Sequence, residues 1–239
     1  MSEVQMKNQY FGDNKDLFKY DLIEKVMLHI RVFKKFIFVP MLTCDDNRKD
    51  GNDRDRNKAR AGFKNDKLVK FLDEASTLKR EERDFIKIKD YFNKQGIRAE
   101  IHGHADKKDY FEHSFRSVYF DSITKKPIQE TLLFIDPDNG LEISGSKERH
   151  LLYSEVRQMY EKLGNNSAIM IIQFFPREDH SQYIKRRSSE LKKITSNLAL
   201  IHDSKIIFFF LTKSIAIKAS LNEILDDYQE GCQDTIFRE

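Results

Sequence analysis

The second half of the chain predicts an α/β fold with a mostly parallel sheet. Two continuous apolar runs, at 132–135 and 168–174, have the pattern of strands that are buried on both faces. Each run is followed by a segment whose apolar residues have helical spacing, near 149–163 and 180–195. Strands that alternate with helices pair in parallel, because each helix returns the chain across the sheet.

The C-terminal part of the sequence has a different pattern, which predicts an antiparallel strand pair. The apolar runs 198–202 and 205–211 are separated only by Asp203 and Ser204, and such a short connection suits a hairpin. A last helix is expected at 217–228. We therefore expect a Rossmann-like three-layer sandwich, with helices on both faces of the sheet.

The first half supplies the remaining elements. A helix over 16–33 follows from apolar residues at helical spacing after an acidic first turn. A short buried strand at 36–39 is expected to stop at Pro40. The other predicted elements of this half are three helices, at 67–75, 81–93 and 106–120, and a strand at 97–101.

Composition favours a single soluble domain over residues 1–239. The chain has only 9 glycines and 4 prolines, and no stretch has the composition of a linker. Residues 43–62 are dense in charges of both signs and predict a mobile surface loop or lid. Two distant cysteines, Cys44 and Cys232, and an N-terminus without an apolar signal core favour a cytoplasmic location and no membrane partner.

The most prominent candidate site follows a predicted buried strand. Its residues are Asp136-Pro137-Asp138-Asn139-Gly140, and open parallel sheets bind ligands beyond the carboxyl ends of their strands. Two carboxylates beside an amide can hold a metal, orient a water molecule or read a base edge. All five residue types also favour turns, so a purely structural turn is the alternative.

A second acidic group lies at the start of the first predicted helix. Asp13 and Asp16 could form a carboxylate pair with Asp136 or Asp138 for acid/base hydrolysis, and these four are the predicted catalytic residues. Helix capping is the alternative role for Asp16. The predicted substrate-binding residues come from both segments and from the end of the next strand: Tyr10, Phe11, Lys19, Tyr20, Asn139, Glu142, Gln173 and Arg177.

Motifs in these segments resemble an uncharacterised family of bacterial proteins. Members begin with YFGD..D..KY.L and carry F.DPDNGLE at a strand end, and the matching segments here are 10–22 and 134–142. Further matches are spread along the chain, at Thr43, Asp46, Asp50, Gly51, Tyr153, Glu155, Gln173 and Arg177. The family pattern has Tyr-Gln-His after its fifth strand, whereas Gln173 is followed here by two phenylalanines. No histidine role is therefore carried over, and the resemblance implies a site without implying a reaction.

The strand order and the Asp-Pro-Asp-Asn motif are also similar to Rossmann-like methyltransferases. That resemblance implies that the acidic residue at this strand end faces a target base. A methyltransferase cofactor needs a glycine-rich turn after the first strand for close approach, and residues 40–46 contain no glycine. S-adenosylmethionine is therefore disfavoured as a cofactor.

Basic residues on a predicted helix indicate a nucleic-acid partner. The net charge of +3 permits such a partner without requiring one. Lys185, Arg186 and Arg187 are the expected contacts to a nucleic-acid backbone, and a solvated helix face is the alternative. Aromatic residues near the acidic site, among them Phe11 and Phe175, could stack on a base.

Signals for metal binding and thiol chemistry are sparse. His102 and His104 could supply two metal ligands, but no third ligand follows at a set spacing. Cys44 could act as a nucleophile only beside a histidine, and a bystander thiol is the expected reading.

Together these features predict a carboxylate-dependent hydrolase that acts on nucleic acid, with DNA preferred. N-glycosidic cleavage, as by a base-excising glycosylase, is preferred over phosphodiester cleavage, since a nuclease usually needs a compact metal cluster. Glycosidic cleavage requires no cofactor, whereas a nuclease would use Mg²⁺. Antiviral defence against foreign DNA would suit this activity. The alternatives are an S-adenosylmethionine-dependent methyltransferase-like enzyme and a non-catalytic nucleotide-binding module.

Overall fold

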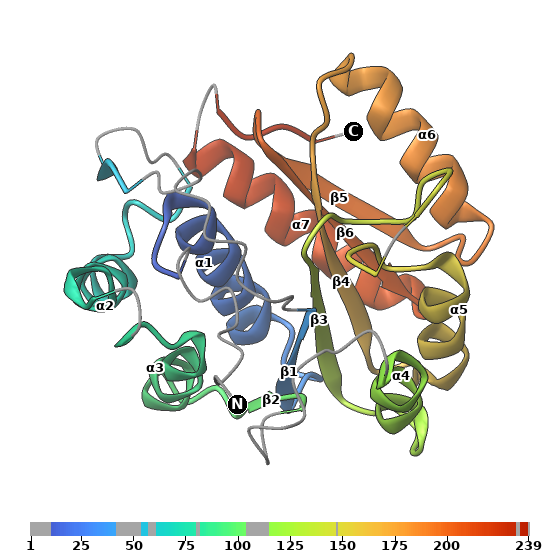
Figure 1. The fold of residues 1–239 in the computed structure, drawn as a ribbon, viewed down its shortest axis with the longest axis horizontal. Helices are drawn as coiled ribbons and strands as arrows, with labels where there is room; N and C mark the ends of the chain where they lie inside the picture. Colours follow the sequence, from blue (N-terminus) through green and yellow to red (C-terminus); the bar gives the residue numbers. More distant parts are fainter. Residues whose placement is uncertain are drawn as a thin grey trace, which may run out of the picture.

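A computed structural model describes residues 11–41, 54–56, 61–79, 82–103, 115–146, 148–232 and 235–238. Its central feature is a six-stranded sheet with helices on both faces (Figure 1). The elements in chain order are α1 (Asn14–His29), β1 (Lys35–Met41), α2 (Asp66–Thr77), η3 (Phe85–Lys87), α3 (Ile88–Lys94), β2 (Ala99–Ile101), α4 (Arg116–Thr124), β3 (Thr131–Pro137), α5 (Tyr153–Lys162), β4 (Ala168–Phe174), α6 (His180–Lys192), β5 (Leu198–His202), β6 (Ile206–Thr212) and α7 (Ile215–Gly231).

The sheet is mixed, with a parallel part and an antiparallel part. Its strands lie in the order β2-β1-β3-β4-β6-β5. The first four strands of that order are parallel, whereas β6 is antiparallel to both of its neighbours, β4 and β5. The predicted α/β class, with a mostly parallel sheet and an antiparallel C-terminal pair, is confirmed. Within that pair, β6 is the inner strand and β5 lies at the edge.

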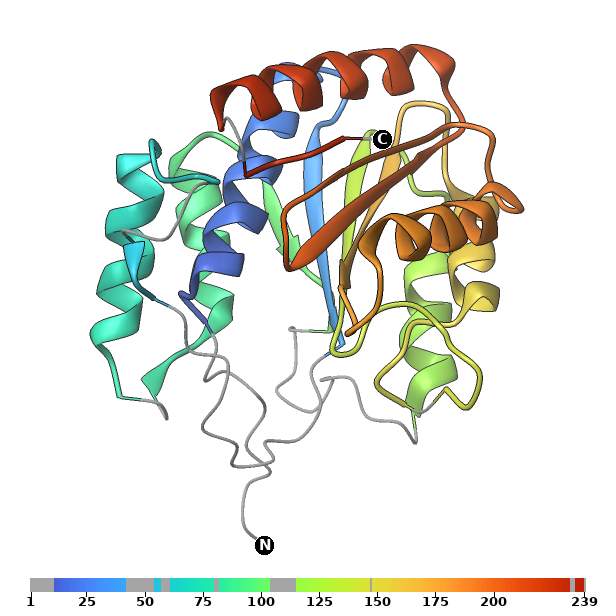
Figure 2. The same cartoon turned by 90° about the horizontal axis from the view of Figure 1, so that it is seen from above.

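Three layers result from this arrangement. Helices α1, α3 and α7 cover one face of the sheet, with α2 packed on the outside of α1, and α4, α5 and α6 cover the other face (Figures 1 and 2). Each face of the sheet has its own buried core, because alternate residues of a strand point to opposite faces. In the part of the chain that the structure describes, no helix is long and apolar enough to cross a membrane.

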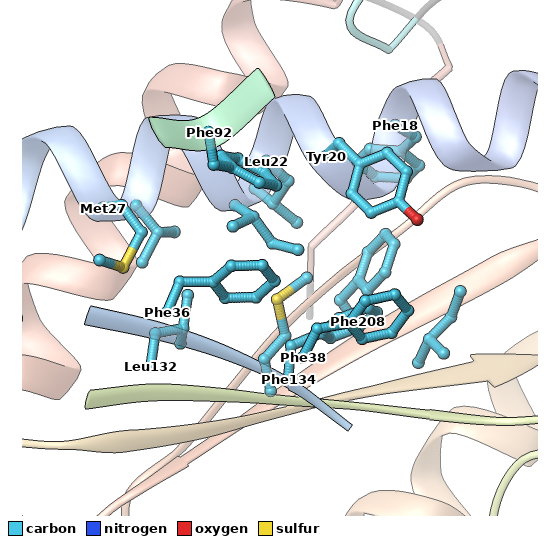
Figure 3. Packing of buried hydrophobic residues seen from close by; sticks show 14 of the residues in the cluster. Phe18, Tyr20, Leu22, Met27, Phe36, Phe38, Phe92, Leu132, Phe134 and Phe208 are labelled. Atoms are coloured by element: carbon cyan, nitrogen blue, oxygen red, sulfur yellow. The ribbon is translucent and has the colours of Figure 1, made fainter. Parts of the chain in front are cut away.

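The core beneath α1 is built largely from aromatic rings (Figure 3). Phe18 of α1 meets Phe208 of β6 edge to face, with ring centroids 4.9 Å apart. On the sheet itself, Phe38 stacks on Phe134 at 5.3 Å. Buried aromatic pairs of this kind add stability beyond their area. Tyr20 of α1 also meets Phe38 of β1 edge to face, with ring centroids 6.4 Å apart, so α1 packs over β1 as well as over β6, which matters for the site described below.

Some element boundaries differ from the sequence-based expectation for physical reasons. β1 does not stop at Pro40 but runs to Met41. Pairing with β2 ends at Phe38, so Pro40 lies where β1 is paired on one side only, and a missing N–H is tolerated there. The helix expected near 149 begins only at Tyr153, because Leu151 pairs with Gly140 and Glu142 in extended conformation.

The other helix boundaries show smaller shifts. α1 ends at His29, before the expected position 33, and the last helix is longer than expected, at Ile215–Gly231. The helix expected over 81–93 is a short 3-10 turn followed by α3, and Asp84 caps the turn. Of the helix expected over 106–120, residues 106–114 lie outside the described part, and α4 covers Arg116–Thr124.

Part of the charged segment 43–62 is packed, contrary to the expectation of a surface loop. Residues 43–53 and 57–60 lie outside the described part of the chain. The Arg56 guanidinium donates to the carbonyl oxygen of Gly12 at 2.9 Å, to Asn14 Oδ1 at 2.8 Å and to Asp73 Oδ1 at 2.8 Å. Ala61 and Gly62 are buried. Charge density alone does not exclude packing when guanidinium groups find carbonyl and carboxylate partners.

Candidate functional site

A buried lysine links the two acidic segments that the sequence singles out. Lys19 Nζ lies 2.8 Å from Asp16 Oδ1, one turn earlier on α1, and 2.8 Å from Asp136 Oδ2 at the end of β3. The Lys19 and Asp16 side chains are 9% and 10% exposed, whereas Asp136 is 19% exposed. Asp136 is therefore the group of this trio that is most accessible to a ligand. We call Asp13, Asp16, Lys19 and Asp136 the acidic cluster.

The start of α1 places the N-terminal members of the acidic cluster. Asp13 is the N-cap residue, and its side chain accepts hydrogen bonds from the backbone N–H groups of Lys15 and Asp16 at 2.9 Å. Asp16 Oδ2 accepts from the N–H of Gly12 at 2.9 Å. Both aspartates thus help to begin the helix, as the capping alternative expected. Asp16 has a further role, because its other oxygen pairs with Lys19.

The acidic cluster lies where open α/β sheets bind ligands. The chain passes from β1 outward to β2 and then returns to β3 on the other side of β1, so the strand order reverses between β1 and β3. Asp136 is in register with Pro40 at the carboxyl ends of these two strands. Ligands of such folds bind in the crevice at this reversal point.

Burial alters the protonation of the acidic cluster. Burial and the neighbouring carboxylate of Asp16 raise the pKa of Asp13 to about 7. Burial also raises the pKa of Asp136, although Lys19 opposes that rise. Burial alone would lower the pKa of Lys19, but the carboxylates of Asp136 and Asp16 raise it well above its usual value. Lys19 stays charged, and Asp13 can exchange a proton near neutral pH.

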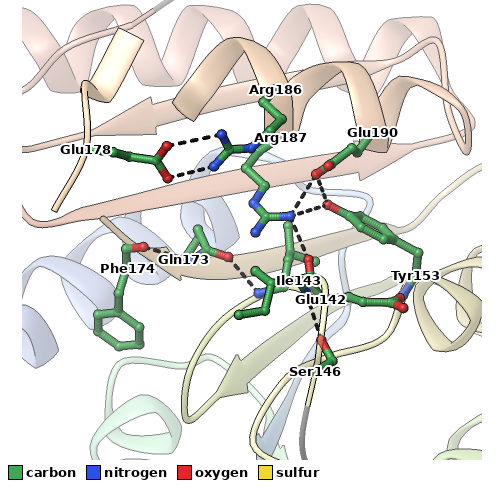
Figure 4. A network of polar contacts seen from close by, with 11 residues as sticks. Glu142, Ile143, Ser146, Tyr153, Gln173, Phe174, Glu178, Arg186, Arg187 and Glu190 are labelled. Carbon is green, nitrogen blue, oxygen red and sulfur yellow. Dashed lines mark hydrogen bonds and ion pairs between the residues drawn. The ribbon is translucent and has the colours of Figure 1, made fainter. Parts of the chain in front are cut away.

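The segment after Asp136 is a tightly held turn. Gly140 has a φ of +84°, and a Cβ atom there would lie 2.4 Å from the Gln173 side-chain amide. Gln173 Oε1 accepts from the backbone N–H of Leu141 at 2.6 Å, and its Nε2 donates to the Phe174 carbonyl at 2.8 Å (Figure 4). Gln173 is 2% exposed, so its position supports the turn and leaves no surface for substrate. The structural-turn alternative is correct for Gly140.

A second group of contacts fixes the far side of this turn. Glu142 Oε2 accepts from the N–H of Tyr153 at the start of α5, at 2.9 Å. The Glu142 carbonyl accepts from Arg187 Nη1 at 2.7 Å, and the same guanidinium reaches Tyr153 and Glu190 (Figure 4). Glu142, expected to bind substrate, thus has a structural role in this arrangement.

Arg116 binds the segment 148–155, which follows the turn, and the sequence did not indicate this role. Its guanidinium makes a bidentate ion pair with Glu155, at 2.5 and 2.6 Å. It also donates to the carbonyl oxygens of Glu148 at 2.8 Å and His150 at 2.6 Å. No sequence pattern identifies Arg116, because its partners lie more than 30 positions away and two of them are backbone carbonyl oxygens.

Two residues of the turn face outward. Asn139 is exposed, and its backbone N–H donates to the Arg149 carbonyl at 3.0 Å. Asp138 is half-buried, with its Oδ2 3.6 Å from Arg149 Nε. Asp138 is therefore paired with an arginine at the rim, and its carboxylate also helps to raise the pKa of Asp136.

The structure corrects the roles of three predicted binding residues. Tyr20, expected to bind substrate, is 1% exposed and packs between Phe11 and Phe38 in the core. Phe11 is 4% exposed and cannot offer its ring to a base. Arg187, expected on a nucleic-acid backbone, is 2% exposed, and its Nη1 donates to the Glu142 carbonyl and to Glu190 inside the protein. These side chains lie on faces that tertiary packing covers. Tyr10 lies outside the described residues.

The remaining basic residues are accessible. Arg177 and Lys185 are exposed, at the turn after β4 and on α6. Arg186 is also exposed and pairs with Glu178 at 2.6 Å. Only part of the predicted basic helix surface is therefore open to a polyanion.

The structure adds no evidence for metal binding by His102 and His104 or for thiol chemistry at Cys44. His102 Nε2 lies 3.0 Å from the Tyr119 carbonyl, while His104 and Cys44 lie outside the described part. Among the described residues, no three His, Cys, Asp or Glu side chains are grouped so that they could hold a metal ion.

Fold and site together define the class: an α/β protein with a Rossmann-like sheet and a buried acidic cluster at the strand-order reversal. Comparison with protein families found no family model that matches the chain, and comparison with curated proteins found no match either. The resemblances based on sequence motifs therefore stay predictions.

Proposed function

We propose that this protein is a carboxylate-dependent hydrolase that acts on the N-glycosidic bond of nucleic acid, with DNA preferred. The observation that carries the proposal is the Lys19 bridge between Asp16 and Asp136 at the strand-order reversal. Glycosidic cleavage develops positive charge on the sugar and needs a placed carboxylate and a proton donor or acceptor. Antiviral defence from a cytoplasmic location forms part of this proposal.

Each member of the acidic cluster has a proposed role. Asp136 is the most exposed member of the Lys19 trio and would stabilise the developing charge on the sugar or orient the attacking water. Asp13, with a pKa of about 7 but only 4% exposed, would take or give a proton within the acidic cluster near neutral pH and would not contact the substrate itself. Lys19 would hold Asp136 in place through the 2.8 Å ion pair. The exposed Asn139 would contact the base edge.

Cationic side chains at the same edge of the sheet support a polyanionic substrate. Lys15 lies on α1 next to Asp16, and Arg149 lies within 3.6 Å of Asp138. Arg177 and Lys185 are exposed in the turn after β4 and on α6. Phosphate contacts of this kind position a nucleic acid without reading its sequence.

The acidic cluster fits glycosidic cleavage better than metal-dependent phosphodiester cleavage. A magnesium site would need the carboxylates of Asp16 and Asp136 to face a shared ion. The Lys19 ammonium occupies that position, 2.8 Å from both. These residues as arranged therefore do not fit Mg²⁺ between them, and we derive no step through a metal.

A methyltransferase-like enzyme is the second candidate, because the sheet has an antiparallel strand inserted between β4 and β5 and reverses its order beside β1. This arrangement supports the resemblance to Rossmann-like methyltransferases. Its prediction is saturable binding of S-adenosylmethionine. Calorimetry that gives no heat of binding would remove this candidate.

The test of the first proposal compares wild type with Asp136→Asn on normal duplex DNA, modified duplex DNA and RNA, with and without Mg²⁺. Products are resolved before and after alkali. We expect strand breaks only after alkali, independent of Mg²⁺, and a loss of 100-fold or more in Asp136→Asn, on the order of one general acid–base contribution. Asp227→Asn, an exposed aspartate of α7, is the matched control. Direct Mg²⁺-dependent breaks, or equal activity in Asp136→Asn, would contradict the proposal.

A further inference from the structure

The aromatic ring of Phe174 lies on the face of the sheet on which Asp136 lies. Phe174 ends β4, and β4 is the neighbour of β3. Phe174 packs partly against the core beneath α1, the face on which Asp136 meets Lys19. It is half-buried, whereas Phe134 and Phe208 on the same face are fully buried.

A cation already covers this ring. Lys15 Nζ lies 5.1 Å from the Phe174 ring centroid. Lys15 is one turn before Lys19 on α1 and next to Asp16. A cation–π contact at a partly exposed site is weak, so another planar or charged group can displace the ammonium.

The neighbouring ring, Phe175, is not available in the same way. It packs against the core on the opposite face of the sheet. His180 stacks on it with centroids 3.8 Å apart and an interplanar angle of 13°. Tyr183 and His202 contact it at 5.9 and 5.6 Å. The base-stacking role that the sequence suggests for Phe175 therefore fits Phe174 better.

We propose that Phe174 is the platform on which a nucleobase of the substrate stacks, and that Lys15 pairs with the phosphate of the same nucleotide. This inference rests on the proposed nucleic-acid function and names a substrate-binding residue of the same site. A base on Phe174 would lie on the sheet face that carries Asp136. Stacking is tolerant of base identity, because every base has a π face.

The test measures binding with fluorescence anisotropy for three ligands: a single-stranded DNA oligonucleotide, the same oligonucleotide with abasic positions, and a mononucleotide. In Phe174→Leu we expect the affinity for the base-bearing oligonucleotide to fall roughly ten-fold or more, as base–aromatic stacking predicts. Affinity for the abasic oligonucleotide should stay unchanged. Phe174→Tyr should retain binding, and Phe175→Leu, on the opposite face, is the matched control.

The Lys15→Gln variant tests the phosphate contact independently. The affinity of this variant for both oligonucleotides should fall, and that affinity should depend less steeply on salt, because one phosphate contact is lost. If Phe174→Leu loses affinity for the mononucleotide in parallel with its affinity for the base-bearing oligonucleotide, a free nucleotide is a sufficient ligand, and the stacking role is still supported. Thermal unfolding of each variant shows whether the fold is retained.

The outcomes separate this inference from the proposed reaction. Base-dependent binding that requires Phe174, without any cleavage by wild type, would support the stacking role and contradict the hydrolase. Cleavage by wild type that is unchanged in Phe174→Leu, with equal affinity for both oligonucleotides, would overturn the stacking role and leave the hydrolase supported. Absence of any nucleic-acid or nucleotide binding by wild type would overturn the inference.

Discussion

Lys19 and Asp136 are 117 positions apart in the sequence and form an ion pair of 2.8 Å at the carboxyl end of β3. The pair connects the first helix to the strand-end motif, and Asp16 makes it a trio. The Lys19 ammonium has both of its carboxylate partners, the buried Asp16 and the part-buried Asp136, only while neither is replaced. The consequences of changing it can be measured.

Lys19→Met should destabilise the protein by roughly 3 kcal/mol, because the buried Asp16 and the part-buried Asp136 would be left without a counterion. Urea denaturation near neutral pH provides the free energy of unfolding. The double variant Lys19→Met with Asp136→Asn should recover part of the loss. Lys25→Met, on an exposed position of α1, should change stability by less than about 0.5 kcal/mol. A Lys19→Met variant as stable as the Lys25 control would show that the ion pair contributes nothing.

The raised pKa of Asp13 should make stability fall as pH rises. In the unfolded chain Asp13 ionises near its usual value of 3.8, whereas in the folded protein its pKa is about 7. Between these two pKa values the folded state holds a proton that the unfolded state has lost, so rising pH favours unfolding. The free energy of unfolding has lost the whole contribution of Asp13 once the pH is above 7. The loss is on the order of a few kcal/mol.

Asp13→Asn should flatten that pH dependence while it retains the cap, since Asn is as good an N-cap as Asp. Urea midpoints at several pH values between 5 and 8 compare the variant with wild type. Asp179→Asn, at the exposed N-cap of α6, is the matched control and should leave the wild-type slope unchanged. Parallel slopes for Asp13→Asn and wild type would contradict a raised pKa at Asp13.

Gly140→Ala should destabilise the strand-end turn by about 2 kcal/mol or more, from positive-φ strain and from a clash with Gln173. Gly145→Ala separates the two causes, because Gly145 has a similar φ of +78° and no described atom within 4 Å of its added Cβ. We expect the Gly145 variant to lose only the strain component. Equal losses at the two positions would show that Gln173 moves aside without cost.

Substitution of the adjacent residues Arg186 and Arg187 of α6 should affect different properties, nucleic-acid binding for Arg186 and stability for Arg187. Arg187→Met removes buried contacts to Glu142, Tyr153 and Glu190 and should cost about 3 kcal/mol of stability. Arg186→Met removes an exposed pair with Glu178 and should cost less than about 1 kcal/mol, but it should weaken any nucleic-acid binding. Thermal unfolding and a salt titration of oligonucleotide binding measure these two effects. A fully stable Arg187→Met would contradict the structural role.

Local patterns were enough to predict much of the fold. Continuous apolar runs and helical spacing depend on neighbouring residues, so the sequence predicted β4 at its observed bounds and β5 and β6 as an antiparallel pair. The position of Asp136 near the carboxyl end of β3 was also predicted, although β3 continues past the expected end at Ile135 to Pro137. The N-cap preference of aspartate likewise depends only on local chemistry at the start of α1.

Tertiary packing decided which of the candidate residues reach the site. Tyr20 and Lys19 are adjacent in the sequence, but their side chains point to different surroundings, the aromatic core and the acidic cluster. Arg186 and Arg187 differ in the same way, as do Phe174 and Phe175. Composition does not distinguish such neighbours, because their burial depends on which face of the helix or strand meets the sheet. The ion pair between Lys19 and Asp136 depends on α1 lying across β1 and β3, and that placement comes from contacts between residues far apart in the chain.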